Sequence, residues 1–351
     1  MTLVQRLQEN GILRLGSMKS GFRYRYAAGG RPGLVQRARI RDLKVPPAWQ
    51  HVAIARSPRA TVQAVGQDRA GRWQYLYHER AVARRERRKA ERLVAFIRAL
   101  PRLRARVARD LTRGDLGREH VLACILRILS TCFLRPGSEE YASENGSYGI
   151  ATLRTRHVRV RGSRVILQFN GKSGREGAYE IADRRVATIV RALLRIPGRR
   201  VFRFRDEHGE LREVRRHHIN AYIKEAMGSA FSAKDFRTWA GTVTCACGLA
   251  RAGVDQGASP TQVRRAIAAA VKETAEALGN TPAVSRSSYI SPAVIGAFEN
   301  GLVLTGPTAD PRILARHRGA RLHRCERALL RLLASRGRAR PRRPAAARLA
   351  A

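Results

Sequence analysis

Acidic side chains are scarce in this sequence of 351 residues, which has 27 Asp and Glu against 69 Lys and Arg. The formal net charge of +42 is far beyond what solubility requires, so a polyanion is the expected partner, and DNA is the obvious candidate. Long apolar runs are missing as well, because no stretch reaches the ~18 residues that cross a membrane and the N-terminus has no apolar secretory core. We therefore expect a protein that does not enter membranes and stays where the DNA is.

Cysteine is also rare. The five cysteines are odd in number and scattered, which excludes a disulfide framework and indicates a reducing compartment. Cys245-Ala246-Cys247 lacks the two-residue gap of a zinc knuckle and has no second ligand pair nearby, so we interpret it as part of an apolar helix. Gly171-Lys172-Ser173-Gly174 is not a nucleotide-binding loop, because Ile166 stands where that motif needs a glycine. We expect no metal, no nucleotide and no cofactor.

The sequence has enough apolar residues for packed cores, since 44% of its residues are hydrophobic. The pattern of hydrophobic residues changes near residue 80. Earlier segments are short, alternating and broken by turn residues, whereas later ones have helical periodicity, beginning with a basic stretch from Arg80 to Leu100 that Pro101 is expected to end. We predict an α+β protein with a β-rich domain over 1–82, a larger, mostly helical domain over 83–302, and a basic extension over 303–351.

A three-stranded antiparallel meander is predicted inside the helical region. Its strands are His157–Val160, Arg164–Phe169 and Gly177–Ile181, with glycine-containing turns between them. Lys172 is thereby placed at a hairpin tip, from which a long side chain can reach into a groove. A lysine in such a turn, taken alone, is usually only solvated.

The C-terminal extension has two parts. Arg321–Ser335 can form a helix with a leucine stripe. Residues 337–351 have a composition typical of disorder, and we expect them either to add nonspecific affinity for DNA or only to increase solubility.

Four dispersed stretches carry side chains suited to attack on a phosphodiester. Two arginines can clamp the negative charge of a phosphate in mid-reaction, while a lysine protonates the departing sugar oxygen and a phenol serves as nucleophile. The sequence predicts that Arg135 stands at the end of an apolar helix over 121–134 with its base packed. Arg237 and Lys234 belong to the predicted start of a second helix, where anions are favoured. The stretches are Phe133-Leu134-Arg135-Pro136-Gly137, Gly171-Lys172-Ser173-Gly174, Lys234-Asp235-Phe236-Arg237-Thr238-Trp239 and Gly279-Asn280-Thr281-Pro282 leading to Tyr289.

In order and spacing these stretches resemble the active-site motifs of type IB DNA topoisomerases, specifically the small poxvirus-like enzymes found in bacteria. The resemblance covers about residues 10–300, and it implies that the β-rich domain over 1–82 binds DNA and that the helical domain over 83–302 is catalytic. It implies that Tyr289 is the nucleophile, that Arg135 and Arg237 clamp the phosphate, and that Lys172 is the general acid. Further groups at the site would be Lys234, near the leaving oxygen, and Asn280, on a non-bridging oxygen.

Two positions depart from the family pattern. The residue nine before the tyrosine is most often histidine in these enzymes and is Asn280 here, which keeps a hydrogen-bond donor but carries no charge. Ser173 stands where poxvirus relatives have an acidic residue beside the lysine, so a proton relay through this position is not expected.

A further resemblance lies in the N-terminal part. The stretch 71–77 matches a strand that the viral enzymes lay along the DNA major groove, which implies that Gln74, Tyr75 and Tyr77 contact DNA, although a strand tyrosine is often a packing residue. The family further implies a monomer that clamps duplex DNA between its domains. We expect it to act in the cytoplasm, on a bacterial nucleoid.

The predicted function is relaxation of supercoiled duplex DNA through a 3′-phosphotyrosyl intermediate, strand rotation and religation, without ATP or metal. Two other interpretations stay open. A tyrosine recombinase shares the arginine, lysine and tyrosine chemistry, but it usually has histidine where Lys234 stands and helices where this N-terminal part is β-rich. An architectural DNA-binding protein would explain the charge but not the complete set of catalytic side chains.

Overall fold

The computed structural model describes residues 1–253, 258–305 and 317–335. It divides into two compact units, Met1–Arg88 and Lys89–Ala351, and the division falls within one long helix, α3 (Glu79–Asp110). The architecture is the predicted α+β arrangement, with an antiparallel sheet in the first unit and a mostly helical second unit that contains a three-stranded sheet. The domain boundaries proposed after residues 82 and 302 stay predictions.

The N-terminal unit is built on a five-stranded antiparallel sheet in the order β2-β1-β3-β4-β5. Alternating burial along β2 reflects the pleat, which sends successive side chains to opposite faces. A small core forms where apolar strand residues such as Ile12 and Ile54 meet Ile40 of α2. The elements are α1 (Leu3–Asn10), β1 (Ile12–Ser17), β2 (Gly21–Tyr26), α2 (Leu34–Asp42), β3 (Gln50–Ile54), β4 (Val62–Gln67) and β5 (Trp73–Tyr77).

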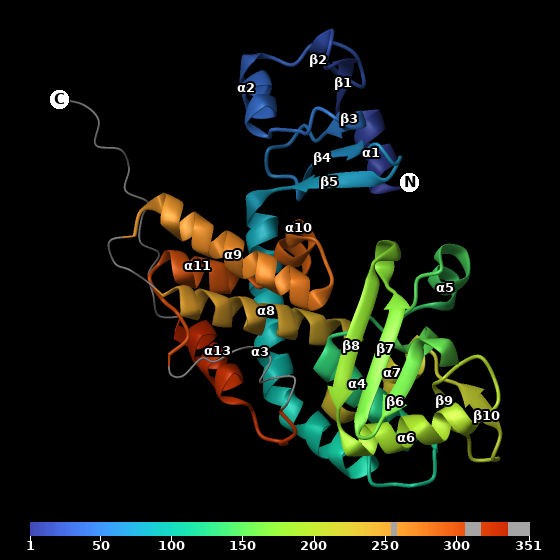
Figure 1. Cartoon of the computed structure of the whole chain (residues 1–351). Helices are drawn as coiled ribbons and strands as arrows, with labels where there is room; N and C mark the ends of the chain where they lie inside the picture. The colour runs from blue at the N-terminus through green and yellow to red at the C-terminus, as the bar shows by residue number, and fades with distance from the viewer. Residues whose placement is uncertain (254–257, 306–316, 336–351) are drawn as a thin grey trace. The chain divides into compact units, whose positions relative to one another are not determined.

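The second unit has α8 (Ala233–Ala252) at its centre. Most of this helix is buried, because apolar or small residues occupy nearly every face of it. Figure 1 shows α9, α11 and α13 gathered around α8, with the sheet β6-β7-β8 beside α4 and α6. The other α-helices and strands are α4 (Arg118–Cys132), α5 (Glu139–Asn145), β6 (Val158–Arg161), β7 (Arg164–Asn170), β8 (Glu176–Ala182), α6 (Arg184–Arg195), β9 (Arg203–Arg205), β10 (Leu211–Glu213), α7 (Arg216–Met227), α9 (Pro260–Leu278), α10 (Pro282–Val284), α11 (Pro292–Glu299) and α13 (Arg324–Ser335). Short 3-10 turns are η1 (Ile150–Thr152), η2 (Thr155–His157) and η3 (Lys172–Gly174), and η4 (Ser285–Tyr289) is a π-helical turn.

Two features of the second unit differ from the sequence prediction. Pro101 was expected to end a helix but lies inside α3, which continues to Asp110. The proline costs one backbone hydrogen bond, but the buried face from Phe96 through Leu103 to Val107 is continuous across it, so packing outweighs the local penalty. The second difference is the small hairpin of β9 and β10, which the sequence pattern did not indicate because its strands have only three residues each.

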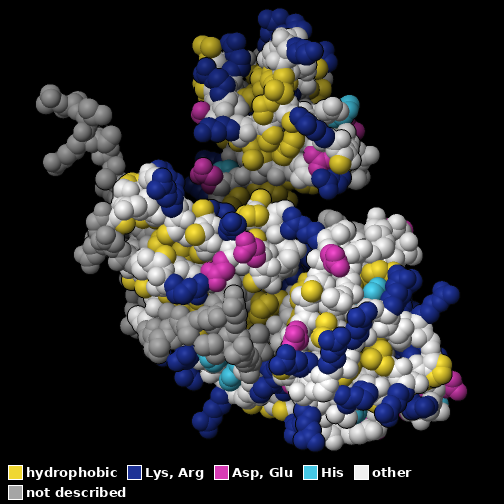
Figure 2. Space-filling model, viewed as in Figure 1, with side chains coloured by type: hydrophobic (Ala, Val, Ile, Leu, Met, Phe, Trp, Pro, Cys, Tyr) yellow, Lys and Arg dark blue, Asp and Glu magenta, His cyan; other side chains and the backbone are white. Residues whose placement is uncertain are grey.

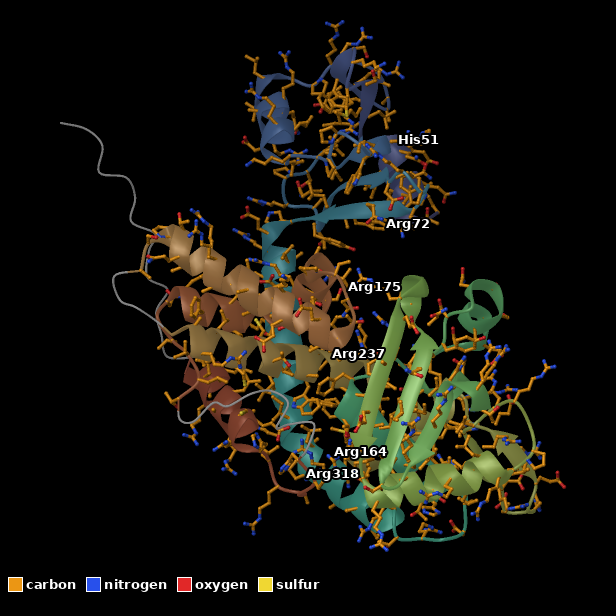
Figure 3. All side chains as sticks on the ribbon, viewed as in Figure 1. His51, Arg72, Arg164, Arg175, Arg237 and Arg318 are labelled. Atoms are coloured by element: carbon orange, nitrogen blue, oxygen red, sulfur yellow. The ribbon has the colours of Figure 1, made fainter. Side chains whose placement is uncertain are left out.

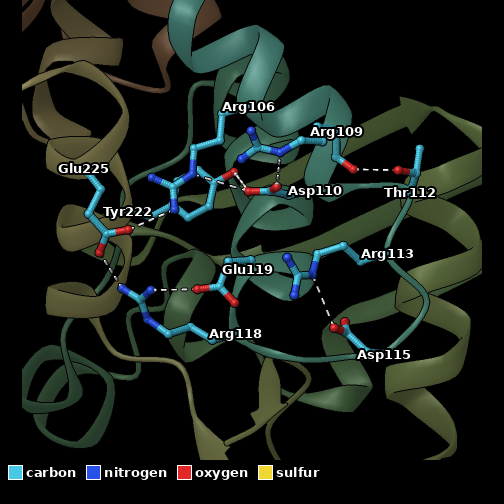
Figure 4. A network of polar contacts seen from close by, with 10 residues as sticks. All are labelled: Arg106, Arg109, Asp110, Thr112, Arg113, Asp115, Arg118, Glu119, Tyr222 and Glu225. Atoms are coloured by element: carbon cyan, nitrogen blue, oxygen red, sulfur yellow. Dashed lines mark hydrogen bonds and ion pairs between the residues drawn. The ribbon is translucent and has the colours of Figure 1, made fainter. Parts of the chain in front are cut away.

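A polar network joins the end of α3 to α4 and α7 (Figure 4). Asp110 is buried and accepts hydrogen bonds from Tyr222 Oη at 2.7 Å and Arg109 Nε at 3.1 Å. Burial would raise the pKa of Asp110, but these donors outweigh burial and lower it. Glu225 on α7 then bridges Arg106 and Arg118, each at 2.9 Å. Charge-assisted hydrogen bonds thus connect the three helices, and the buried carboxylate of Asp110 stays ionised.

The described part of the C-terminal extension packs into the second unit. The predicted helix is present as α13, which contacts α8 and α11 and buries Leu329. Arg104 on α3 donates to both carboxylate oxygens of the fully buried Glu326, at 2.9 and 2.7 Å. A buried carboxylate needs such a partner, so this pair fixes the position of α13 against α3. The predicted disordered tail, 337–351, lies outside the described residues.

Basic side chains dominate the face of the second unit seen in Figure 2. Exposed arginines lie along β6, β7 and α6, while acidic side chains are few on this face. The arginines are Arg159, Arg161, Arg164, Arg184, Arg185 and Arg195. Among the described helices, none is long and apolar enough to cross a membrane.

Candidate active site

Arg135 is held just beyond the end of α4. The helix ends at Cys132, the left-handed backbone of the capping residue Phe133 (φ 53°) turns the chain, and Leu134 is buried behind it. The next turn packs closely on Gly149, where a Cβ atom would lie only 2.4 Å from the backbone nitrogen of Gly137. The Arg135 carbonyl accepts from the Ile150 N–H at 2.9 Å. The base of Arg135 is therefore firmly anchored, as the sequence indicated.

Arg237 lies in the second turn of α8 and is only 3% exposed. Its Nη1 donates to the carbonyl of Phe133 at 2.5 Å and its Nη2 to the carbonyl of Leu278 at 2.9 Å, so one guanidinium joins the ends of α4 and α9 to α8. Burial and then the charge of Arg135 lower the pKa of Arg237. Its Nε has no hydrogen-bonding partner within the described residues. Figure 3 labels Arg237 in the interior of the second unit.

Asn280 follows α9 and connects to the first arginine. Its Oδ1 accepts a hydrogen bond from Arg135 Nη2 at 2.5 Å, and its main-chain carbonyl accepts from Arg175 Nη1 at 3.0 Å. Asn280 is 8% exposed, and its Nδ2 has no partner among the described residues. A buried amide donor without a partner costs free energy, so it is available for an acceptor that the structure does not contain.

Tyr289 ends the π-helical turn η4 and is half-buried. The guanidinium carbon of Arg237 lies 4.7 Å from the centre of its ring. Burial would raise the pKa of Tyr289, but the charges of Arg237, Arg135 and Lys234 outweigh burial and lower it from its ordinary value of about 10. The phenol is thus closer to its nucleophilic, ionised form than a free tyrosine is.

The two lysines of the predicted set are both exposed. Lys172 lies in η3 between β7 and β8, at the hairpin tip that the sequence predicted. Lys234 lies in the first turn of α8, whose capping box is made by Ser232 and Asp235. Within the described residues neither ammonium group has a hydrogen-bonding or ion-pair partner. The fold therefore brings Arg135, Arg237, Asn280 and Tyr289 into one connected cluster. The charge of Lys234 helps to lower the pKa of Tyr289, whereas Lys172 lies on a separate hairpin.

The three predicted DNA-contacting residues belong to β5 in the other unit. Tyr75 and Tyr77 point to the same face, with ring centres 6.2 Å apart, and Arg85 stacks on Tyr77 at 4.2 Å. Tyr75 is 39% exposed. Gln74 alternates to the opposite face and donates to Asp68 at 2.9 Å. Among the described strands β5 pairs with β4 alone, so it is an edge strand of the sheet.

Sequence reasoning missed residues that support the cluster. Lys89 on α3 donates to the carbonyls of Ser287 and Ile290, on either side of the tyrosine, at 3.3 Å each. Gly241 on α8 lies under Tyr289, where an added Cβ would stand 3.0 Å from the Tyr289 carbonyl oxygen and 3.1 Å from its Cβ. No local pattern identifies such residues, since Gly241 is 48 residues from Tyr289 in the sequence and Lys89 is 198 residues from Ser287.

Within the described residues, no group of three or more His, Cys, Asp or Glu side chains could hold a metal ion. All five cysteines are free and buried. Burial raises the pKa of Cys245 to about 12, which leaves this thiol in its unreactive protonated form.

Comparison with known proteins identifies the class to which this fold and cluster belong. The family model of the catalytic core of eukaryotic DNA topoisomerase I matches residues 79–297, which include all six predicted catalytic residues. The model of the N-terminal domain of bacterial DNA topoisomerase IB matches residues 21–68. The predicted DNA-contacting residues of β5 lie between the two matched ranges.

Curated relatives agree with these family models. A DNA topoisomerase 1B of Acanthamoeba polyphaga mimivirus is 34% identical over 75% of this chain and 80% of its own length. The DNA topoisomerase 1B of Vaccinia virus (strain Copenhagen) is 22% identical over 66% of this chain and 70% of its own. The chain belongs to the type IB DNA topoisomerases. The resemblance seen in the sequence motifs is thereby confirmed, and the protein is an isomerase that acts on DNA.

Proposed function

We propose that this protein relaxes supercoiled duplex DNA by transient cleavage of one strand, through a 3′-phosphotyrosyl intermediate, followed by strand rotation and religation. The observation that supports this most directly is the position of Tyr289 against Arg237, in the same cluster as Arg135 and Asn280. A phenol with a lowered pKa stands near two charged guanidinium groups and an amide donor that has no partner among the described residues. That combination suits attack on a phosphodiester.

In the proposed cleavage step, the Tyr289 oxygen loses its proton to solvent and attacks the phosphorus. A bond forms between the phenolic oxygen and phosphorus, and the bond from phosphorus to the 5′-oxygen breaks. Arg135 and Arg237 stabilise the charge on the non-bridging oxygens, and the Nδ2–H of Asn280 donates to one of them. Lys172 gives its proton to the departing 5′-oxygen, with Lys234 close to the same oxygen.

Religation reverses these steps, and the 5′-hydroxyl attacks the phosphotyrosine. Because the bond energy is kept in that linkage, the reaction requires neither ATP nor a metal ion. We further propose that the protein acts as a monomer in a bacterial cytoplasm, on the nucleoid. Tyr75 and Tyr77 would contact DNA from one face of β5, and Gln74 would do so by exchanging its bond to Asp68 for one to DNA.

Incubation with supercoiled plasmid, without ATP and in EDTA, tests this function. Wild type is expected to relax the plasmid and to leave a covalent adduct on the 3′ end of the nicked strand, whereas Tyr289→Phe is expected to do neither. Ser288→Ala is the control, because it removes the neighbouring exposed hydroxyl of the same turn. Joint molecules would indicate a recombinase instead, and retardation of the plasmid without relaxation would indicate a binding protein only.

A further inference from the structure

The backbone around Tyr289 has an unusual conformation. In the turn η4 the Ile290 N–H bonds to the carbonyl of Ser285 at 2.9 Å, five residues back, instead of following the ordinary helical ladder. Such wide turns are short, and they leave neighbouring carbonyls in need of donors from elsewhere. Two of these carbonyls belong to Ser287 and Ile290, two residues before and one residue after the tyrosine.

Lys89 provides the donors. Its ammonium group bonds to both carbonyls at 3.3 Å, and its side chain is half-buried. One turn further along α3, Arg92 forms a two-pronged ion pair with Asp235 at the start of α8, with distances of 2.6 and 2.7 Å. The same face of α3 thus contacts both the tyrosine turn and the first turn of α8. Asp235 is next to Lys234 and two residues before Arg237.

We propose that Lys89 is a positioning residue for the nucleophile, holding the carbonyls on both sides of Tyr289 so that its phenol stays in place over Arg237. This inference rests on the proposed function. Lys89 acts through the backbone, whereas Arg237, Arg135 and Lys234 act on the charge of the phenol itself. A displacement of about 1 Å in a reacting group can cost roughly 100-fold in rate, so loss of these two bonds should slow cleavage markedly.

The test is single-turnover cleavage of a suicide duplex at saturating enzyme by wild type and Lys89→Met. Lys89→Met keeps the apolar stem and removes the donors, and it is expected to cleave roughly 10- to 100-fold more slowly. Lys89→Arg restores donors and is expected to cleave within a few-fold of wild type. Arg98→Met is the matched control, because it removes one exposed cation from the opposite face of the same helix and should leave the rate unchanged.

Two further measurements separate positioning from other roles. The first is the DNA affinity of each variant as a function of salt concentration. If Lys89 bound only a DNA phosphate, Lys89→Met would bind DNA more weakly and with a smaller salt dependence, and its cleavage rate at saturating enzyme would be unchanged. A duplex with sulfur in place of the 5′-bridging oxygen has a leaving group that needs no proton. It should restore cleavage by Lys172→Ala but not by Lys89→Met, since the latter has lost alignment of the attacking group.

Cleavage by Lys89→Met at the wild-type rate, rescue by the sulfur substrate, or a defect only in affinity would each overturn the inference. If Lys89→Met did not fold, as judged by its melting temperature, a slow but folded Lys89→Arg would overturn it and a fast one would support it. Wild type that formed no covalent adduct at all would instead refute the proposed function. The two failures are therefore distinguishable.

Discussion

At the scale of single residues, the reactivity of Tyr289 depends on a balance of opposing effects. Partial burial disfavours the phenolate, while the adjacent Arg237 and then Arg135 and Lys234 favour it, and the net result is a pKa below that of free tyrosine. The tyrosine can be ionised for attack and still be a good leaving group when the DNA hydroxyl returns.

This balance predicts a specific pH dependence. The phenolate is the attacking form, so the single-turnover cleavage rate should rise with pH, with a midpoint below that expected for a free tyrosine, since the pKa of Tyr289 is lowered. In Arg237→Ala the largest favourable charge is lost, and the residual rate should rise only at higher pH. Arg237→Lys keeps a charge and should shift the profile less. A profile unchanged in Arg237→Ala would contradict this account.

Asn280 is held by Arg135 and Arg175 and presents its remaining amide donor without a partner in the described residues. An amide does not titrate near neutral pH, whereas histidine does. Cleavage by wild type should therefore show no titration attributable to this position between about pH 5.5 and 7.5. Asn280→His should retain activity and introduce such a titration. A folded, DNA-binding histidine variant without activity would refute this assignment.

At the scale of secondary-structure elements, α8 brings the site together. Its first turns carry Lys234 and Arg237, and Gly241 one turn later allows Tyr289 to lie directly against the helix. The adjacent Thr242 donates its hydroxyl to the Tyr289 carbonyl at 3.2 Å and accepts from the Ser291 N–H at 3.1 Å. The tyrosine turn is thus seated on α8 from one side and bound by Lys89 of α3 from another.

Gly241→Ala should separate activity from stability. The added methyl group would push the backbone of Tyr289 by a few tenths of an ångström. This should lower the cleavage rate about 10-fold, because a displacement of about 1 Å in a reacting group can cost roughly 100-fold. Stability should change little, because alanine is favoured over glycine within a helix by about 1 kcal/mol, which offsets the crowding. Gly248→Ala is the control, since its methyl group would be similarly crowded but against α9. Equal cleavage rates for both variants, measured at saturating enzyme, would contradict a role for the close packing of Tyr289 against Gly241.

The sequence predicted the parts of the fold and site that depend on local pattern. Lys172 at a hairpin tip, Arg237 at a helix start and Arg135 after a helix end all follow from turn, cap and periodicity signals, and the structure confirms these placements. Continuation of α3 through Pro101 could not be predicted locally, because it depends on packing with helices distant in the sequence. For the same reason Lys89 and Gly241 were missed, since their roles arise only when α3, α8 and the tyrosine turn meet.

At the scale of the whole molecule, positive charge is spread over both units and the C-terminal tail. The tail 336–351 contains six arginines and no acidic residue. Charge of this kind adds sequence-independent affinity for DNA that falls as salt rises. The tail should therefore strengthen binding without taking part in the chemistry.

Deletion of residues 336–351 should flatten the salt dependence of DNA binding, measured as the slope of log Kd against log salt concentration. Single-turnover cleavage at saturating enzyme should remain. If cleavage vanished in the deletion variant while the rest of the chain stayed folded, the tail would have to belong to the active site.

The central claim is that Tyr289 forms the covalent link to DNA. The most direct measurement is to trap the adduct on a suicide duplex labelled at each end in turn, digest it, and map the modified peptide by mass spectrometry. We predict a single adduct on Tyr289, joined to the 3′-phosphate side of the break and formed in EDTA without ATP. An adduct on another residue, a link to the 5′ end, or an undiminished adduct in Tyr289→Phe would contradict the account.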